Sequence, residues 1–128
     1  MLLAAGTSAC ATQPPAGDSG PCPVGNAGGW RAWVDLMPGS EKKLWVAGNV
    51  TAPTGGWRLS LERGPVQEID PPVQIIYVRA EPPSGGATQA LVKHELHGNF
   101  PPLARYGAVT IRCGSETLAD INRVEEAH

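Results

Sequence analysis

The sequence lacks a long apolar run and any concentration of basic residues. No run approaches the roughly 18–20 residues that a membrane-spanning helix needs, so we expect no transmembrane helix. Its 10 lysines and arginines are scattered among 12 acidic residues, and the net charge is -2. Because binding to a phosphate backbone requires a basic stripe, this composition argues against a nucleic-acid partner.

Catalytic motifs are also missing. The chain contains neither a G-x-S-x-G nucleophile motif nor a glycine-rich phosphate loop. Its carboxylates are spread over turns and outer strand faces, with no pair in a geometry suited to acid–base chemistry. We therefore predict that the protein is not an enzyme, with no catalytic residues and no cofactor.

The histidines do not form a recognisable metal motif. His94 and His97 lie three residues apart within a predicted strand, which turns them to opposite faces. They could share a metal ion only if the strand ended between them, so we predict no metal site. A metal-binding accessory protein that uses these two histidines is the third and last of our functional hypotheses.

Glycine and proline are abundant, with 16 and 13 residues, and they fall between short apolar runs. This spacing indicates many turns rather than a disordered chain. A chain of 128 residues can bury the core of one domain but not of two.

The runs between the turns read as β-strands, and no long stretch has helical periodicity. In residues 106–114, for example, Val109, Ile111 and Cys113 alternate with small or polar residues, as in a strand with one buried face. Segments of this kind are residues 30–36, 42–51, 57–62, 73–78, 89–97, 106–114 and 116–124. Seven short strands at this spacing predict an all-β fold, a seven-stranded antiparallel Ig-like β-sandwich. A small β-barrel is the alternative.

The first ten residues, Met1 to Cys10, are apolar, then small, and end at a cysteine. Here the chain resembles bacterial lipoproteins, whose signal ends in a lipobox just before a cysteine that becomes diacylated. Ser8-Ala9-Cys10 fits the lipobox, whereas Thr7 stands where the family usually has leucine. The alternative is a cleaved or ordinary flexible leader that happens to contain a cysteine.

The resemblance implies that Cys10 carries a lipid anchor and that residues 1–10 are the signal and lipobox. Ala11 follows the cysteine, which in this family favours the outer membrane over the inner membrane. We therefore expect the protein at the periplasmic face of the bacterial envelope. Residues 11–21 would then be a flexible tether, and residues 22–128 the β-sandwich domain.

Three cysteines leave one without a partner. Acylation of Cys10 would leave Cys22 and Cys113 as a disulfide pair, closing a loop of roughly 90 residues that is worth about 4–5 kcal/mol on the chain-entropy model. Two alternatives are a Cys10–Cys22 bond, with Cys113 as a free thiol, and a catalytic cysteine.

The tryptophans suggest a binding surface. If residues 30–36 and 42–51 form a hairpin, one face carries the core residues Trp30, Ala32, Val34, Leu44, Val46 and Val50. The register then places Trp33 and Trp45 together on the outer face, flanked by Arg31 and Lys43. Tryptophan and arginine dominate interaction hot spots, so these four residues are a candidate protein-binding patch. The alternative is that a loop or the tether covers them, or that a bulge turns one tryptophan inward.

We therefore predict an envelope-anchored, non-enzymatic protein-binding or assembly module whose partner is another envelope protein or a cell-wall component. Beyond the leader, the chain also resembles small Ig-like envelope proteins of unassigned function, which supplies no site. The second hypothesis is an inhibitor of a periplasmic or exogenous hydrolase, a protease or a lysozyme, that presents the loop 82–87 or 52–56.

Overall fold

In a computed structural model, the protein is an all-β fold. The structure describes residues 20–39, 41–85 and 90–127. These residues form eight strands, which are β1 (Gly25–Asp35), β2 (Lys43–Ala52), β3 (Arg58–Gln67), β4 (Val73–Glu81), β5 (Val92–Phe100), β6 (Ala108–Cys113), β7 (Glu116–Ile121) and β8 (Glu125–Ala127). Within the described residues there is no helix of the length and apolarity needed to cross a membrane.

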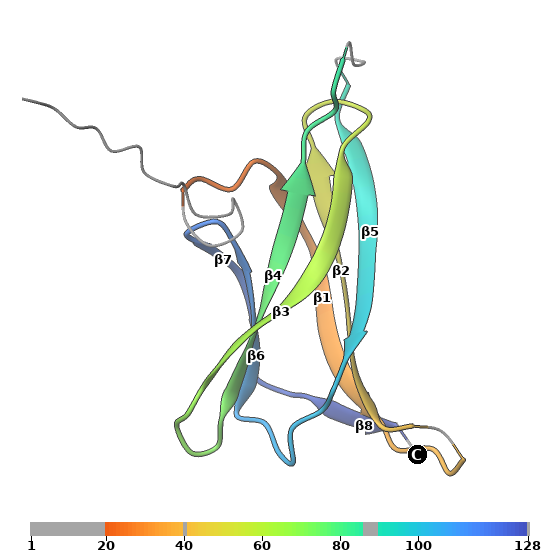
Figure 1. The fold of residues 1–128 in the computed structure, drawn as a ribbon, viewed down its shortest axis with the longest axis vertical. Helices are drawn as coiled ribbons and strands as arrows, with labels where there is room; N and C mark the ends of the chain where they lie inside the picture. The colour runs from red at the N-terminus through yellow and green to blue at the C-terminus, as the bar shows by residue number, and fades with distance from the viewer. Residues whose placement is uncertain (1–19, 40, 86–89, 128) are drawn as a thin grey trace, which may run out of the picture.

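The strands form two facing sheets of four (Figure 1). One has the order β5-β2-β1-β8 and the other the order β3-β4-β6-β7. The core lies between them and draws on both sheets, with Val34, Leu44 and Val46 from the first, and Ile76 and Ile111 from the second. The predicted all-β architecture of two packed layers is therefore confirmed.

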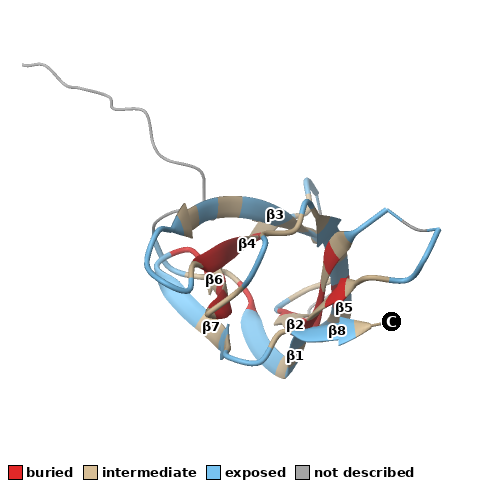
Figure 2. Cartoon of the chain, turned by 90° about the horizontal axis from the view of Figure 1, so that it is seen from below, coloured by how far each residue is buried: buried red, intermediate tan, exposed pale blue. Residues whose placement is uncertain are grey.

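Strand alternation explains which side chains enter the core. In β6, Val109, Ile111 and Cys113 are almost completely buried, as the period of two predicts. In β3, Leu59 and Leu61 pack against the core while their neighbours along the strand are exposed. Figure 2 shows that the buried residues concentrate in inner strands such as β2, β4 and β6, whereas the edge strands β3 and β8 are exposed or intermediate.

Strand β4 departs most from alternation, because residues 73–76 are all buried. It lies in the interior of its sheet between β3 and β6, a position that suits a strand with apolar residues on both faces. The buried polar residue in this run is Gln74, whose side-chain amide donates to the carbonyls of Gly64, at 2.9 Å, and Ile75, at 3.0 Å.

The prediction of seven antiparallel strands is wrong in two respects. First, the segment 116–124 is not one strand, because β7 ends at Ile121 and the chain then crosses to the other sheet as β8. Second, β8 runs parallel to β1 and β6 runs parallel to β4. Each of these strands arrives by a connection that leaves the opposite sheet, so it does not reverse direction as a hairpin strand does.

The small-barrel alternative is also wrong. Within the described residues the two sheets share no strand, and β3, β5, β7 and β8 are their edges. Edges β3 and β5 approach each other along one side of the sandwich without joining into one sheet.

The segment that precedes β1 joins the two sheets on the side of the sandwich opposite β3 and β5. Cys22 forms a disulfide with Cys113 at the end of β6, so the predicted pairing of these two cysteines is confirmed and the alternatives with a free or catalytic Cys113 are wrong. The carbonyl of Gly20 accepts hydrogen bonds from the backbone N–H and the hydroxyl of Ser115, at 2.8 and 3.0 Å. The Cys22 N–H donates to the Glu116 carboxylate at 3.0 Å. The chain is thus held on the β6–β7 turn before it enters the first sheet.

Candidate binding surface

The first hairpin places two tryptophans side by side on the outer face of its sheet. The side chains that alternate with them, Ala32, Val34, Leu44 and Val46, are buried between the sheets. β1 and β2 pair Trp33 directly with Trp45, as the register of the sequence predicts. The two rings are stacked, with centroids 6.4 Å apart and planes 12° from parallel.

The register of the hairpin is irregular only upstream of this pair. Shifts occur between Asn26 and Gly28 and between Gly28 and Arg31, whereas pairing is continuous from Arg31 to Asp35. The alternative that a bulge turns a tryptophan inward is therefore wrong for Trp33. The irregular part of β1 is held by the Asn26 side chain, which accepts from the Gly28 N–H at 3.0 Å and from the Trp30 indole at 2.9 Å.

Two cationic side chains flank the stacked pair. The Arg31 guanidinium lies over the Trp33 ring, 5.0 Å from its centroid, which is within the range of a cation–π interaction. Lys43 lies two residues before Trp45 on the same face of β2. In the backbone register of the hairpin it is opposite Asp35. We call the outer surface formed by Arg31, Trp33, Lys43 and Trp45 the tryptophan face.

The neighbouring strands add polar residues that the sequence analysis missed. Asn99 of β5 pairs with Trp45, and Glu125 of β8 pairs with Trp33. Both are exposed. His97, also exposed, pairs with Ala47 and lies 3.5 Å from the Glu95 carboxylate. These residues reach the tryptophan face through pairings of strands far apart in the sequence, and such pairings leave no local pattern to detect.

The arrangement offers a large flat contact with a mixed polar border. Both tryptophans are half-buried and do not belong to the apolar side chains that pack against the core. Their hydrophobic area can therefore be covered further by a partner, while Arg31, Lys43, Asn99 and Glu125 can form hydrogen bonds and ion pairs around it.

His94 and His97 lie on opposite faces of β5. β5 continues without interruption through both of them, so the condition under which they could share a metal ion is not met. His94 pairs with the core residue Val50, and its Nε2 is buried without a hydrogen-bond partner among the described residues. His97 lies on the outer face. No group of three or more potential metal-binding side chains occurs in the part of the chain that the structure describes.

The remaining predicted site residue, Cys10, lies outside the described residues, as do the leader and residues 11–19 of the proposed tether. Comparison of the chain with protein family models, with curated proteins and with solved structures finds no match.

Proposed function

We propose that this protein is an envelope-anchored lipoprotein that acts as a non-enzymatic binding or assembly module. The domain would be tethered through lipid on Cys10 to the periplasmic face of the outer membrane. It would dock through the tryptophan face onto another envelope protein or a cell-wall component.

The observation that carries this proposal is the stacked Trp33–Trp45 pair on the outside of a two-layer fold. A folded domain gains more by burying tryptophan than by exposing it, yet here strand alternation directs two of them away from the core. The partly exposed rings, with Arg31 over one of them, have the composition of an interaction hot spot.

The finer assignment to an immunoglobulin-like fold stays a prediction. Two facing sheets and a disulfide that joins the segment before β1 to the opposite sheet support it. The parallel pairs β1–β8 and β4–β6 differ from the antiparallel sheets of that fold.

The docking proposal is tested by crosslinking in cells. A photoreactive amino acid at Asn99, which pairs with Trp45, should capture a partner, and Trp33→Ala or Trp45→Ala should abolish the capture. The same reagent at Ser60, exposed on β3 of the other sheet, should capture nothing specific. Leu91→Ala removes a side chain that is 76% exposed away from the tryptophan face and should preserve the capture. Equal capture by wild type and Trp45→Ala would reject the proposal.

The anchor is tested separately by labelling cells with a palmitate analogue. We expect label on the wild type and none on Cys10→Ala. An unlabelled wild type, or equal labelling of both proteins, would show that Cys10 is not acylated and would leave the docking proposal untouched.

A second candidate function is inhibition of a protease or a lysozyme. The β2–β3 connection and residues 82–85 lie together at one end of the sandwich (Figure 1), and a Cβ on Gly56 would come within 2.9 Å of the Pro83 side chain. Residues 86 and 87 of the predicted loop 82–87 lie outside the described residues. Trp57 donates to the Thr54 hydroxyl at 3.0 Å. Such paired loops suit rigid insertion into an active-site cleft. Stoichiometric loss of activity of a periplasmic protease or a lysozyme would support inhibition, and unchanged activity at excess protein would reject it.

A further inference from the structure

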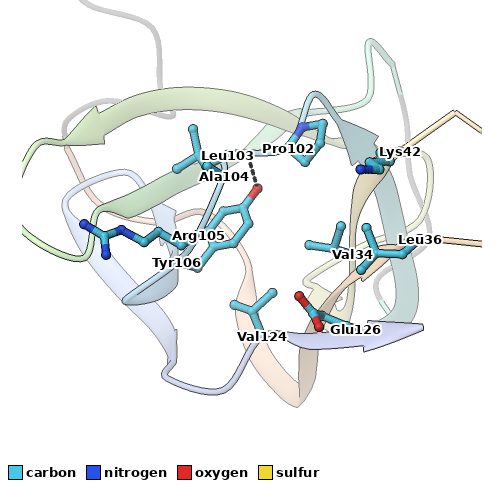
Figure 3. Close-up of a pocket in the computed structure, with 10 residues that line it drawn as sticks. All are labelled: Val34, Leu36, Lys42, Pro102, Leu103, Ala104, Arg105, Tyr106, Val124 and Glu126. Atoms are coloured by element: carbon cyan, nitrogen blue, oxygen red, sulfur yellow. Dashed lines mark hydrogen bonds between the residues drawn. The ribbon is translucent and has the colours of Figure 1, made fainter. Parts of the chain in front are cut away.

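The end of the sandwich opposite the paired loops contains a cavity that no part of the proposed function uses. Its volume is about 460 Å³, within the range of pockets that hold small ligands. It lies between the end of β1, the β5–β6 connection and β8 (Figures 2 and 3). It is lined by Val34, Leu36, Lys42, Pro102, Leu103, Ala104, Arg105, Tyr106, Val124 and Glu126.

The lining of the cavity combines polar and apolar surface, and its apolar part comes from several segments of the chain. Val34 is buried, and Leu36, Tyr106 and Val124 pack against the core from different elements. Figure 3 shows their side chains around one space, with the Tyr106 ring on one side and Val34 and Leu36 on the other. An apolar ligand segment would displace water from these surfaces, which is favourable.

Tyr106 supplies a fixed hydrogen-bond donor at this space. The backbone N–H of Leu103 donates to the Tyr106 oxygen at 2.7 Å, which orients the phenol. The hydroxyl proton has no acceptor among the described residues. Burial raises the pKa of Tyr106 above its ordinary value, so the phenol is protonated at neutral pH and can donate.

Lys42 supplies a positive charge across the cavity from the Tyr106 ring, near Pro102 and above Leu36 (Figure 3). Its ammonium forms no ion pair or hydrogen bond within the described part of the chain. The other charged groups are already engaged, since Arg105 is paired with Asp70 and Glu126 has an interaction of its own. The Tyr106 hydroxyl and the Lys42 ammonium are therefore left to bind a ligand, and both are hydrogen-bond donors.

We propose that this cavity binds an amphipathic monocarboxylate. Its apolar body lies among Val34, Leu36 and Val124, and its carboxylate accepts hydrogen bonds from Tyr106 and Lys42. A short fatty acid and a peptide with an apolar C-terminal residue share this chemistry. The proposal does not depend on the tryptophan face, which lies on the outer surface of the sheet.

The test is an NMR titration of the full chain carrying Cys10→Ala, which keeps it free of lipid, with the Cys22–Cys113 disulfide formed. The probes are octanoate, octylamine and octanol, each below its micellar concentration. Octanoate should shift the methyl resonances of Val34, Leu36 and Val124 in a saturable way. It should bind about tenfold more tightly than the other two probes, because only its carboxylate can accept charge-assisted hydrogen bonds from Tyr106 and Lys42, which are stronger than hydrogen bonds between neutral groups. Unsaturable shifts, or equal or tighter binding of octylamine or octanol, would overturn the proposal.

Variants identify the anchoring groups. Lys42→Gln and Tyr106→Phe should each weaken octanoate binding several-fold, whereas Lys93→Gln, on the exposed face of β5, should leave it unchanged. An equal effect of all three, or no effect of Lys42→Gln, would overturn the proposal even if Tyr106→Phe fails to fold.

The source of the carboxylate is distinguished by a tetrapeptide that ends in leucine, with a free or an amidated C-terminus. Tighter binding of the free peptide than of octanoate indicates a polypeptide end, and the reverse indicates a small acid. Both outcomes support a carboxylate site. Equal binding of the free and amidated peptides excludes a polypeptide end, and equal binding of octanoate and octanol contradicts the carboxylate site whatever the peptides do.

Discussion

The Trp30 ring lies directly against Gly48, at the place where any other residue would put its Cβ. A Cβ built on Gly48 would come within 2.1 Å of two atoms of the indole. Trp30 and Gly48 are on neighbouring strands, β1 and β2, and both face the core side of the sheet. The glycine thus makes the room that lets a large ring pack beside small core residues such as Ala32 and Val50.

Gly48→Ala should therefore destabilise the fold. Gly48 has no positive φ, so the effect is steric and not conformational. Overpacking of this kind costs about 1–3 kcal/mol. The measurement is urea unfolding followed by tryptophan fluorescence. Gly85→Ala is the matched control, because a Cβ there meets nothing within 4 Å, and its midpoint should equal that of the wild type. Equal midpoints for Gly48→Ala and the wild type would contradict this prediction, because they would show that the Trp30 indole can move aside without loss of stability.

The disulfide is expected to contribute much of the stability. It joins residues 91 positions apart, and a loop of that length stabilises by about 4–5 kcal/mol on the chain-entropy model. The double substitution of Cys22 and Cys113 by alanine should lower the midpoint of guanidinium unfolding strongly. A reductant should do the same to the wild type and should have no effect on the double variant. Unfolding of the wild type that is insensitive to reductant would contradict this assignment of stability.

The buried Gln74 side chain is expected to stabilise the fold although it is polar. Its amide nitrogen satisfies carbonyls where β3 is irregular, between Arg63 and Val66. Gln74→Leu keeps the volume but leaves these carbonyls unpaired, which costs about 1–3 kcal/mol. Gln67→Leu, at an exposed position of β3, is the control and should be neutral in thermal unfolding. Equal melting temperatures of both variants would mean that water replaces the amide.

The sequence predicts local features of this fold well, because strand faces follow from alternation. The apolar zigzags locate the strands, and the hairpin register brings Trp33 onto Trp45. The segment 73–78, which contains Gln74, is identified correctly as a strand. In each case neighbouring residues carry the information.

Long-range order could not be predicted in the same way. Nothing near Ile121 signals that the chain changes sheets there, and the three residues of β8 are too few to show a period. The sequence therefore predicts Val124 in one strand with residues 116–121, and it assigns Glu125, beside Trp33, and Glu126 to no site. These positions depend on which strands pair across the fold, which the local pattern does not specify.

Tyr106 should make stability depend on pH at the alkaline end. Burial raises the pKa of Tyr106, against the opposing effects of the Leu103 N–H and the Arg63 charge. A raised pKa in the folded state means that stability is fully present below the unfolded pKa of about 10 and is lost as pH rises through the folded value, because the unfolded chain ionises first.

The measurement is the difference in unfolding free energy between the wild type and Tyr106→Phe, taken from about pH 8 to 11. The difference cancels the contributions of all other ionisable groups, which both proteins share. It should be constant up to about pH 10 and then shift in favour of the variant. A difference that stays constant over the whole range would mean that Tyr106 ionises as easily in the folded protein as in the unfolded one. The phenol would then be open to water, and the apolar surroundings assigned to the cavity would be wrong.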